Sequence, residues 1–459
     1  MMVYGLIGEH LGHSFSRVVH GMMSSDPYDL VELAPNELEG FLKARDFSGL
    51  NVTIPYKQAV MPFMDRLDAS AELTGAVNTI VRKGSELWGY NTDYYGFMEM
   101  VRYFGADFAD ARVLILGAGG AAKAVHAAAF SLGAAEVLHA VRRPSGTGQV
   151  SIFDPSSFDA CNIIVNATPV GMYPRWQDSP VDLQELMPRM RLRAVLDCIY
   201  NPLRTSLVLD SFSDGVFPSG SHSEVEEVMS ERSDRGGFGG TFPRPLGVQR
   251  DNRLEASDLN GISVGGLYML VGQAVKAREL FTGEPLPQDT AERLYVRLLK
   301  SKRNIVLCGM PSCGKTTIGK ALAEATGRRF EDSDSVVELQ AGMTIPRIFE
   351  REGEQGFRAR ETAALESLAP EQGLVIATGG GMPLKPENIR LMHHNGIICL
   401  LQRDLAMLQP GGERPLSGNR RALEQLYERR RAAYLAAADI IIDNNGPFED
   451  TLAQLLALC

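Results

Sequence analysis

The sequence has few cysteines and no long uninterrupted apolar segment: six cysteines are scattered among 459 residues. No apolar run approaches the roughly 20 residues that a membrane-spanning helix needs, so no membrane segment is predicted. The first residues, Met1–Gly8, carry no basic stretch ahead of an apolar run, and no secretory signal is expected. The cysteines lack metal-ligand or disulfide spacing, which favours a reducing cytoplasm.

Positive charge is also in short supply, with 46 lysines and arginines against 56 acidic residues and a formal net charge of −10. A nucleic acid or an anionic membrane is therefore not expected as a partner. Anionic small molecules have to be held by local basic side chains. The hydrophobic fraction of 44% and the charged fraction of 22% are typical of a globular enzyme, and the length favours two or three domains.

Two glycine-rich loops each follow an apolar segment that is typical of a buried strand. After Arg112–Leu116, the run Gly117–Ala121 resembles the turn that seats a dinucleotide pyrophosphate on a helix N-terminus. After Asn304–Cys308, the run Gly309–Thr316 has the G-x-x-x-x-G-K-T spacing that wraps backbone N–H groups around the phosphates of a nucleoside triphosphate. The chain is therefore predicted to handle both a redox dinucleotide and a phosphoryl donor.

The first half also contains short polar motifs that are weak when taken singly. Ser14 and Ser16 alone are best interpreted as helix caps. Lys57 alone is most simply a solvated surface charge. The turn Asn91–Asp93 alone is most simply an Asx turn.

Taken together, these motifs resemble shikimate dehydrogenases in order and spacing, across roughly residues 1–285. The matching segments are Gly12–Ser16, Asn51–Lys57, Gly75–Thr79, Gly89–Asp93, Gly117–Ala121, Asn166–Met172, Tyr200–Thr205 and Met269–Gln273. The resemblance implies NADPH-dependent reduction of 3-dehydroshikimate to shikimate.

The resemblance also implies roles for individual residues. Lys57 is the expected proton donor or acceptor at the reacting hydroxyl, with Asp93 beside it, because a nearby ammonium stabilises an alkoxide-like oxygen and delivers its proton. Substrate contacts are implied for Ser14, Ser16, Thr53, Lys57, Asn78, Asp93 and Gln273. Cofactor contacts are implied for Gly117, Ala118, Gly119, Gly120, Ala121, Arg142, Arg143, Cys198, Tyr200 and Gly266.

The residues after the second strand of the dinucleotide unit bear on the choice of cofactor. Val141, Arg142 and Arg143 stand there, without the acidic residue that would bind an unphosphorylated ribose. A pair of guanidinium groups suits a 2′-phosphate, so NADP is expected. The simpler interpretation is a charged strand end, and the alternative function is a quinate/shikimate dehydrogenase that uses NAD.

Across residues 303–459 the sequence resembles shikimate kinases. The matching segments, beyond the glycine loop, are Phe330–Asp334, Phe349–Glu361, Thr378–Gly381, Arg414–Leu416 and Arg430–Tyr434. ATP contacts are implied for Pro311, Ser312, Cys313, Gly314, Lys315, Thr316, Thr317 and the lid residue Arg414.

The kinase resemblance also implies how the acceptor and the metal are held. Asp334 is the expected acceptor for the proton of the attacking hydroxyl, and Lys315 reaches the β- and γ-phosphates. The implied shikimate contacts are Asp334, Arg358, Gly380 and Arg430, where the spacing to Tyr434 selects Arg430 from three consecutive arginines. Thr316 and Asp332 are the implied Mg²⁺ residues.

The predicted fold class is α/β throughout, in three parts. A substrate α/β domain takes residues 1–100 and 260–285, and a Rossmann NADP domain takes 101–259 with a Ser/Gly-rich insertion at about 210–258. A linker at 286–302 leads to a P-loop kinase domain with a parallel sheet at 303–459. The hypothesis is a cytoplasmic bifunctional enzyme that uses NADPH, ATP and Mg²⁺ for consecutive steps of the shikimate pathway; a non-catalytic metabolite sensor is the alternative from another class.

Overall fold

The computed structural model describes residues 2–12, 15–211, 262–409 and 419–459. It divides into an N-terminal unit, Met1–Ser211 with Leu259–Leu299, and a C-terminal unit whose described residues begin at Lys300. Almost all of the predicted insertion at about 210–258 lies outside the described residues. Among the described helices, none is long and apolar enough to cross a membrane.

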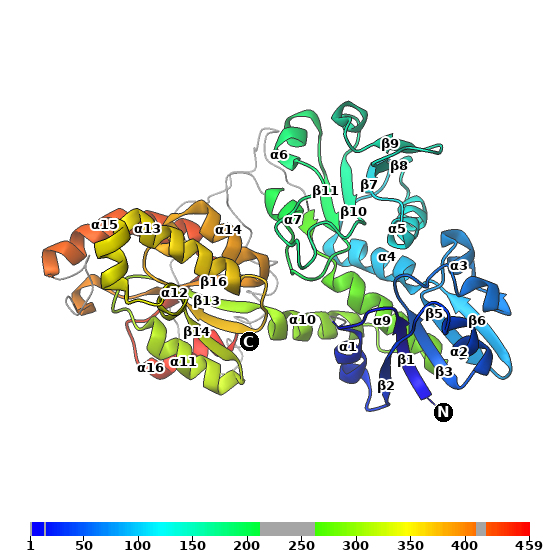
Figure 1. Cartoon of the computed structure of the whole chain (residues 1–459), viewed down its shortest axis with the longest axis horizontal. Helices are drawn as coiled ribbons and strands as arrows, with labels where there is room; N and C mark the ends of the chain where they lie inside the picture. Colours follow the sequence, from blue (N-terminus) through cyan, green and yellow to red (C-terminus); the bar gives the residue numbers. More distant parts are fainter. Residues whose placement is uncertain (1, 13–14, 212–261, 410–418) are drawn as a thin grey trace. The chain divides into compact units, whose positions relative to one another are not determined.

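A mixed six-stranded sheet opens the N-terminal unit (Figure 1). Strand β1 pairs in parallel with β2 and β3, whereas β3, β5 and β6 pair antiparallel. In spatial order the strands are β2 (Tyr28–Glu32), β1 (Met2–Gly8), β3 (Phe47–Val52), β5 (Thr79–Lys83), β6 (Glu86–Tyr90) and β4 (Arg66–Leu67). The helices that accompany them are α1 (Ser16–Met23), α2 (Leu38–Ala44) and α3 (Ala69–Thr74).

One expected strand is shorter than the sequence suggests. The apolar run Gly75–Val81 reads as a strand, but β5 begins only at Thr79. Gly75 has φ of +57° and ends α3 as its left-handed C-cap, donating its N–H to the carbonyl of Glu72. The glycine therefore terminates a helix.

The second sheet of this unit has six strands, and all of its neighbours pair in parallel. In spatial order they are β9 (Gln149–Ser151), β8 (Glu136–Val141), β7 (Arg112–Leu116), β10 (Ile163–Asn166), β11 (Ala194–Asp197) and β12 (Ile262–Val264). The helices α5 (Gly120–Ser131), α6 (Leu183–Leu186) and α7 (Ser206–Asp210) connect or flank these strands. Numbered along the chain, this is the 3-2-1-4-5-6 order of dinucleotide-binding folds, so the Rossmann prediction is confirmed.

Two long helices, α4 (Thr92–Phe104) and α9 (Leu267–Thr282), lie between the two sheets of this unit (Figure 1). Their backbones approach closely at two glycines: a Cβ added to Gly96 would lie 2.5 Å from the carbonyl oxygen of Met269 and 2.8 Å from the backbone nitrogen of Gln273. On α9, Gly272 faces Gly96 directly. A side chain at either position would push the helices apart.

The predicted linker at 286–302 is mostly helical. Helix α10 spans Thr290–Lys302, and its side chains Leu294, Tyr295 and Leu298 are buried in the core of the N-terminal unit. The ring of Tyr103 packs edge-on against Tyr295 at 5.6 Å. The domain boundaries remain predictions, but these contacts assign the first part of α10 to the N-terminal core.

The C-terminal unit contains a five-stranded parallel sheet, which confirms the predicted fold class. In spatial order its strands are β14 (Arg329–Asp332), β15 (Leu374–Ala377), β13 (Asn304–Cys308), β16 (Gly396–Gln402) and β17 (Ile440–Asp443). Its helices are α11 (Lys315–Thr326), α12 (Ser333–Ala341), α13 (Ile345–Leu368, bent at Gly353), α14 (Pro386–Asn395), α15 (Arg420–Ala437) and α16 (Phe448–Leu456). Strands β13 and β15 are buried throughout, as expected for a sheet covered on both faces.

We predict that Gly96→Ala lowers the free energy of unfolding of the N-terminal unit by about 1–3 kcal/mol, because α9 has to move away from the added methyl group. Both tryptophans of the chain, Trp88 and Trp176, lie in this unit, so urea unfolding followed by tryptophan fluorescence reports on it selectively. The matched control is Gly40→Ala in α2, where an added Cβ meets no atom within 4 Å. That control should gain up to about 1 kcal/mol from helix propensity. Equal effects of the two substitutions would contradict the close-packing argument.

Candidate active sites

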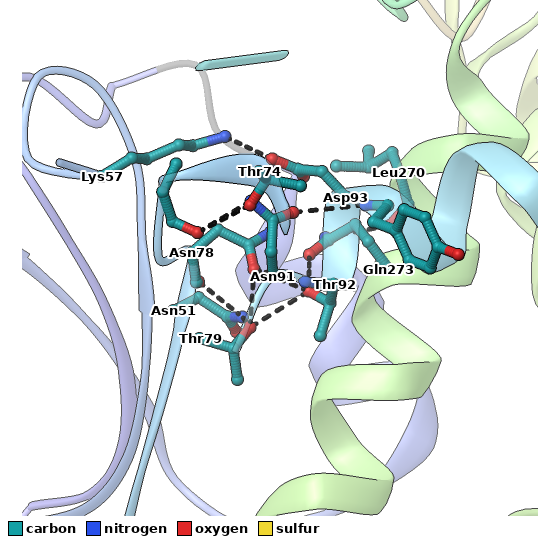
Figure 2. A network of polar contacts seen from close by, with 12 residues as sticks. Asn51, Lys57, Thr74, Asn78, Thr79, Asn91, Thr92, Asp93, Leu270 and Gln273 are labelled. Atoms are coloured by element: carbon teal, nitrogen blue, oxygen red, sulfur yellow. Dashed lines mark hydrogen bonds and ion pairs between the residues drawn. The ribbon is translucent and has the colours of Figure 1, made fainter. Parts of the chain in front are cut away.

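Lys57, the expected proton donor or acceptor, lies next to Asp93, the carboxylate expected beside it. Lys57 follows β3 in a turn, and Asp93 lies in the first turn of α4. Lys57 Nζ lies 2.6 Å from Asp93 Oδ2, and the two side chains are 19% and 13% exposed. The carboxylate therefore fixes the direction of the ammonium while leaving it accessible (Figure 2).

Amide and hydroxyl side chains form a connected network beside this ion pair (Figure 2). The Oδ1 atom of buried Asn78 accepts a hydrogen bond from the backbone N–H of Thr92 at 2.6 Å. The Thr92 hydroxyl lies 3.2 Å from Gln273 Oε1, which connects α4 to α9. Asn51 donates to the Thr79 hydroxyl at 3.0 Å, and that hydroxyl lies 3.0 Å from the Thr92 hydroxyl. The amides of Asn78 and Gln273 are thus held by Thr92 at the start of α4, and the amide of Asn51 is held by Thr79 in β5.

The remaining predicted substrate residues lie on the neighbouring segments. Ser16 is the first residue of α1 and is buried, while Thr53 directly follows β3 and is half-buried. Ser14 lies outside the described residues. Phe15 packs against the predicted cofactor residue Tyr200 with ring centroids 5.2 Å apart, so the turn before α1 reaches the second sheet.

The dinucleotide loop has a backbone suited to a pyrophosphate. Gly117 has φ of +105°, and a Cβ there would lie 2.9 Å from the methyl group of Thr168. Helix α5 starts at Gly120, and its N-cap Gly119 supplies no side-chain cap, so the first N–H groups of the helix lack a capping partner from the N-cap. A Cβ on Gly120 would lie 3.6 Å from Lys57 Cδ. The loop therefore ends beside the predicted catalytic lysine.

The other predicted cofactor residues fall at two places on the second sheet. Arg142 and Arg143 are exposed in the turn directly after β8. Cys198 and Tyr200 follow β11, and Gly266 is the N-cap of α9. Burial raises the pKa of the Cys198 thiol, and the nearby carboxylates of Asp197 and Asp93 raise it further. The thiol is therefore protonated, and it lies within electrostatic range of the Lys57–Asp93 pair.

In the C-terminal unit, the phosphate loop has the expected geometry. Gly309 and Gly314 have φ of +139° and +97°, and α11 begins at Lys315 without a side-chain cap at its N-cap. The Lys315 ammonium donates to the carbonyls of Gly309 and Met310 at 3.0 and 3.1 Å. The loop residues predicted to contact ATP are Pro311, Ser312, Cys313, Gly314, Lys315, Thr316 and Thr317, whereas Arg414 lies outside the described residues.

The two predicted metal residues are in direct contact. The Thr316 hydroxyl donates to Asp332 Oδ2 at 2.9 Å, while Asp332 Oδ1 accepts from the backbone N–H of Asp334 at 3.1 Å. A hydroxyl and a carboxylate next to a phosphate loop are hard oxygen donors of the type that Mg²⁺ prefers. The residues present therefore fit the ion.

Three consecutive glycines after β15 leave room for the predicted acceptor-site side chains. A Cβ on Gly379 would lie 2.5 Å from Asp334 Oδ1, and a Cβ on Gly380 would lie 2.7 Å from Arg430 Nη1. A Cβ on Gly381 would overlap the guanidinium of Arg358. The loop could carry side chains only if these polar groups moved, so the glycines leave the space that Asp334, Arg358 and Arg430 occupy.

Two residues for which the sequence predicted no role, Glu361 and Tyr434, form hydrogen bonds with the predicted shikimate-binding arginines. Glu361 is buried and accepts a hydrogen bond from Arg358 Nη1 at 2.6 Å. Burial raises the pKa of its carboxyl group, and this effect outweighs the lowering by the charge of Arg358. Tyr434 donates to the carbonyl of Gly380 at 2.6 Å and accepts from Arg430 Nη1 at 3.4 Å. The i,i+3 and i,i+4 spacings of these pairs are the sequence signal that identifies them as helical neighbours.

Arg430 is buried, whereas its neighbours Arg429 and Arg431 are exposed. The spacing to Tyr434 thus selected the arginine that points into the unit. Its role in binding remains a prediction.

Family models match both parts of the chain. The model of the shikimate dehydrogenase substrate binding domain matches residues 6–80, and the shikimate kinase model matches residues 311–458. Both matches fall where the sequence motifs were found.

Individual relatives agree with the family models. A shikimate dehydrogenase (NADP(+)) from Clostridium beijerinckii is 30% identical over 310 residues, which is 64% of this chain and 97% of the relative. The corresponding protein from Halothermothrix orenii is 37% identical over 234 residues, covering 45% and 80% of the two chains. A solved chorismate mutase/shikimate 5-dehydrogenase fusion protein from Clostridium acetobutylicum has a TM-score of 0.50 and 27% identity, covering 65% of this chain and 97% of that one. A shikimate kinase from Acinetobacter baumannii is 37% identical, covers 36% of this chain and 96% of that one, and has a TM-score of 0.34.

A buried histidine lies under the predicted substrate site. His20 in α1 stacks on Tyr28 with ring centroids 4.0 Å apart, and the Tyr28 hydroxyl donates to Asn51 at 2.8 Å. Burial, with a smaller contribution from the charge of Arg278, lowers the pKa of His20 to about 3. The ring is therefore neutral in the folded unit.

We predict that His20 makes the N-terminal unit acid-sensitive. Between its unfolded pKa near 6.5 and its folded pKa of about 3, the unfolded chain binds the proton more readily, so the free energy of unfolding falls as the pH falls. The slope contributed by this single group is at most about 1.4 kcal/mol per pH unit. Urea unfolding followed by tryptophan fluorescence from pH 7 to 4 should show a shallower slope for His20→Gln. The control is His10→Gln, at an exposed position, and it should keep the slope of the unmodified chain; no difference between the two variants would refute the assignment.

Proposed function

The chain belongs to the shikimate dehydrogenase family and carries a shikimate kinase domain in its C-terminal part, and on this premise we propose which residues perform the two reactions. It is a bifunctional enzyme of the shikimate pathway, with shikimate dehydrogenase and shikimate kinase activities, so the product of the first reaction is the substrate of the second. The observation that carries the residue assignment is the Lys57–Asp93 ion pair beside the dinucleotide loop.

In the dehydrogenase reaction, NADPH supplies the hydride when it is bound. Lys57 donates a proton to the carbonyl oxygen of 3-dehydroshikimate as negative charge develops there. Asp93 keeps the ammonium directed toward that oxygen. Asn78 and Gln273, already fixed by Thr92, bind substrate hydroxyls, and a misplaced hydroxyl would leave a buried partner unpaired at a cost of about 1–3 kcal/mol. Ser14, Ser16 and Thr53 complete the proposed pocket.

We propose NADP as the dinucleotide. The relatives from Clostridium beijerinckii and Halothermothrix orenii are shikimate dehydrogenases (NADP(+)). Arg142 and Arg143 supply two exposed guanidinium groups at the end of β8, where the adenosine ribose lies in this type of fold. The loop Gly117–Ala121 holds the pyrophosphate, and Cys198, Tyr200 and Gly266 line the nicotinamide side.

For the kinase we propose that Arg358 and Arg430 bind the carboxylate of shikimate, with the backbone of Gly380 between them. Asp334 accepts the proton of the attacking 3-hydroxyl. Lys315 and the loop N–H groups bind the phosphates of ATP, and Arg414 closes over them. Thr316 and Asp332 would hold Mg²⁺, which neutralises phosphate charge when bound. The cytoplasmic location, and the absence of nucleic-acid and membrane partners, remain predictions from the composition.

We predict that the two sites fail independently. Lys57→Ala should lower dehydrogenase kcat by at least about 100-fold, because the proton donor is lost, while phosphorylation of supplied shikimate is unchanged. Asp334→Asn should silence the kinase and leave NADPH oxidation unchanged. Two separate assays of the purified full chain measure this: NADP formation from 3-dehydroshikimate and NADPH, and ADP formation from supplied shikimate, ATP and Mg²⁺.

In each variant the retained activity shows that the other unit is folded, and the urea-unfolding midpoint of the mutated unit, compared with that of the unmodified chain, shows whether that unit is intact. Joint loss of both activities in either folded variant would contradict the separate assignment. An unmodified chain that turned over neither substrate would support the metabolite-sensor alternative instead.

Cofactor choice gives a separate prediction. Arg142→Gln should reduce kcat/KM for NADPH by about tenfold, the effect of one lost charge-assisted contact, and leave kcat/KM for NADH within about twofold. The control is Arg175→Gln, an exposed arginine of the same unit that lies outside the proposed sites and should change neither value. An unmodified chain that preferred NADH would favour the quinate/shikimate dehydrogenase alternative.

A further inference from the structure

A buried carboxylate ends the fifth strand of the Rossmann sheet. Asp197 is the last residue of β11, and its side chain is fully inaccessible to solvent. It lies next to β10, whose last residue, Asn166, is its register partner. In this fold, ligands bind in the crevice beyond the carboxyl ends of the strands, so Asp197 lies at the base of that crevice.

The hydrogen bonds of Asp197 connect the end of β10 with the turn and the helix start that follow β11. Asn166 Nδ2 donates to both carboxylate oxygens, at 3.1 and 3.0 Å. The backbone N–H of Ile199 donates to Oδ1 at 2.8 Å, and the Thr205 hydroxyl donates to Oδ2 at 2.7 Å. The side-chain oxygen Oδ1 of Asn166 accepts hydrogen bonds from the backbone N–H and the hydroxyl of Thr168. One carboxylate thus fixes the turn after β10 and the turn after β11 together.

The turn that Asp197 holds reaches both halves of the proposed dehydrogenase site. The Cys198 N–H donates to the carbonyl of Asn166 at 2.9 Å, and the Ile199 carbonyl accepts from the N–H of Gly266 at 2.7 Å. A Cβ on Gly266 would overlap the carbonyl of Cys198, so the turn lies directly against the start of α9. Helix α9 carries Gln273 toward the substrate network.

We infer that Asp197 is a positioning residue for hydride transfer: it sets the turn Cys198–Tyr200 against the nicotinamide and against the start of α9. This inference rests on the proposed dehydrogenase function. Asp197 itself touches neither substrate nor cofactor in this assignment. It acts through the backbone of the residues that do.

The electrostatic environment supports this role. Burial raises the pKa of Asp197 to about 7, even though the hydrogen bonds from Asn166, Ile199 and Thr205 lower it. A buried carboxylate with a raised pKa costs free energy in its ionised form, so stability alone does not explain its presence here. The four hydrogen bonds that it accepts hold two loops in one arrangement.

The test uses Asp197→Asn in the full chain. An amide replaces one of the two acceptor oxygens by a donor nitrogen, so either the backbone N–H of Ile199 or the hydroxyl of Thr205 loses its acceptor. The readout is the rate constant of a single turnover of 3-dehydroshikimate, with enzyme and NADPH both saturating, because that constant does not depend on the fraction of enzyme that is folded. We expect it to fall about tenfold or more, while KM for NADPH stays within about threefold and kinase kcat is unchanged.

A second pair of variants covers the case in which Asp197→Asn does not fold. Thr205→Val removes one of the four hydrogen bonds and should lower the same rate constant about threefold or more, whereas Thr205→Ser keeps the hydroxyl and should restore it. Unchanged single-turnover rates in both folded Asp197→Asn and Thr205→Val would overturn the inference. If the unmodified chain itself failed to reduce 3-dehydroshikimate, the proposed dehydrogenase function would fail instead, and the two outcomes are therefore distinguishable.

Discussion

Two helices of the N-terminal unit come close enough to contribute to one proposed active site only because each has a glycine where they cross. At Gly96 and Gly272 the backbones of α4 and α9 meet without intervening side chains. Helix α4 presents Asp93 near its start, and α9 presents Gln273 one residue beyond its own glycine. The hydrogen-bond network from Asn78 through Thr92 to Gln273 depends on that crossing, because an added methyl group would separate its two ends.

Glycines also make room in the C-terminal unit, but there they accommodate charged side chains and not a second helix. There the glycines Gly379–Gly381 make room for charged side chains, namely Asp334, Arg430 and Arg358. Glu361 and Tyr434 then fix the two arginines by direct hydrogen bonds. In both units, glycines leave room for the proposed catalytic side chains, and neighbouring side chains hold them in one orientation by hydrogen bonds.

The sequence predicted local features well because their signals are local. The strand, glycine turn and helix of Arg112–Ser131 and of Asn304–Thr326 lie within one continuous stretch each, and both are found where expected. The Thr92–Gln273 contact joins residues 181 positions apart, and no sequence pattern predicts it. From the sequence alone Asp197 is an ordinary residue at the end of a strand, because its partner Asn166 is known only once β10 is placed beside β11. The strand expected from Gly75 failed for another reason, since a left-handed glycine ended the preceding helix.

The two proposed pockets bind the same small acid with different electrostatics, one nearly neutral and the other strongly basic, and the proposed reactions explain why. Reduction of a ketone develops one negative charge on one oxygen, so a single ammonium compensated by Asp93 suffices, surrounded by neutral amides and hydroxyls. Phosphoryl transfer brings a polyanion to a carboxylate-bearing acceptor. That site therefore needs Lys315, Arg358 and Arg430 together, in a chain whose net charge is −10. Local basic side chains, held by buried acids such as Glu361, overcome the overall negative field, which is how an acidic protein recognises acidic substrates.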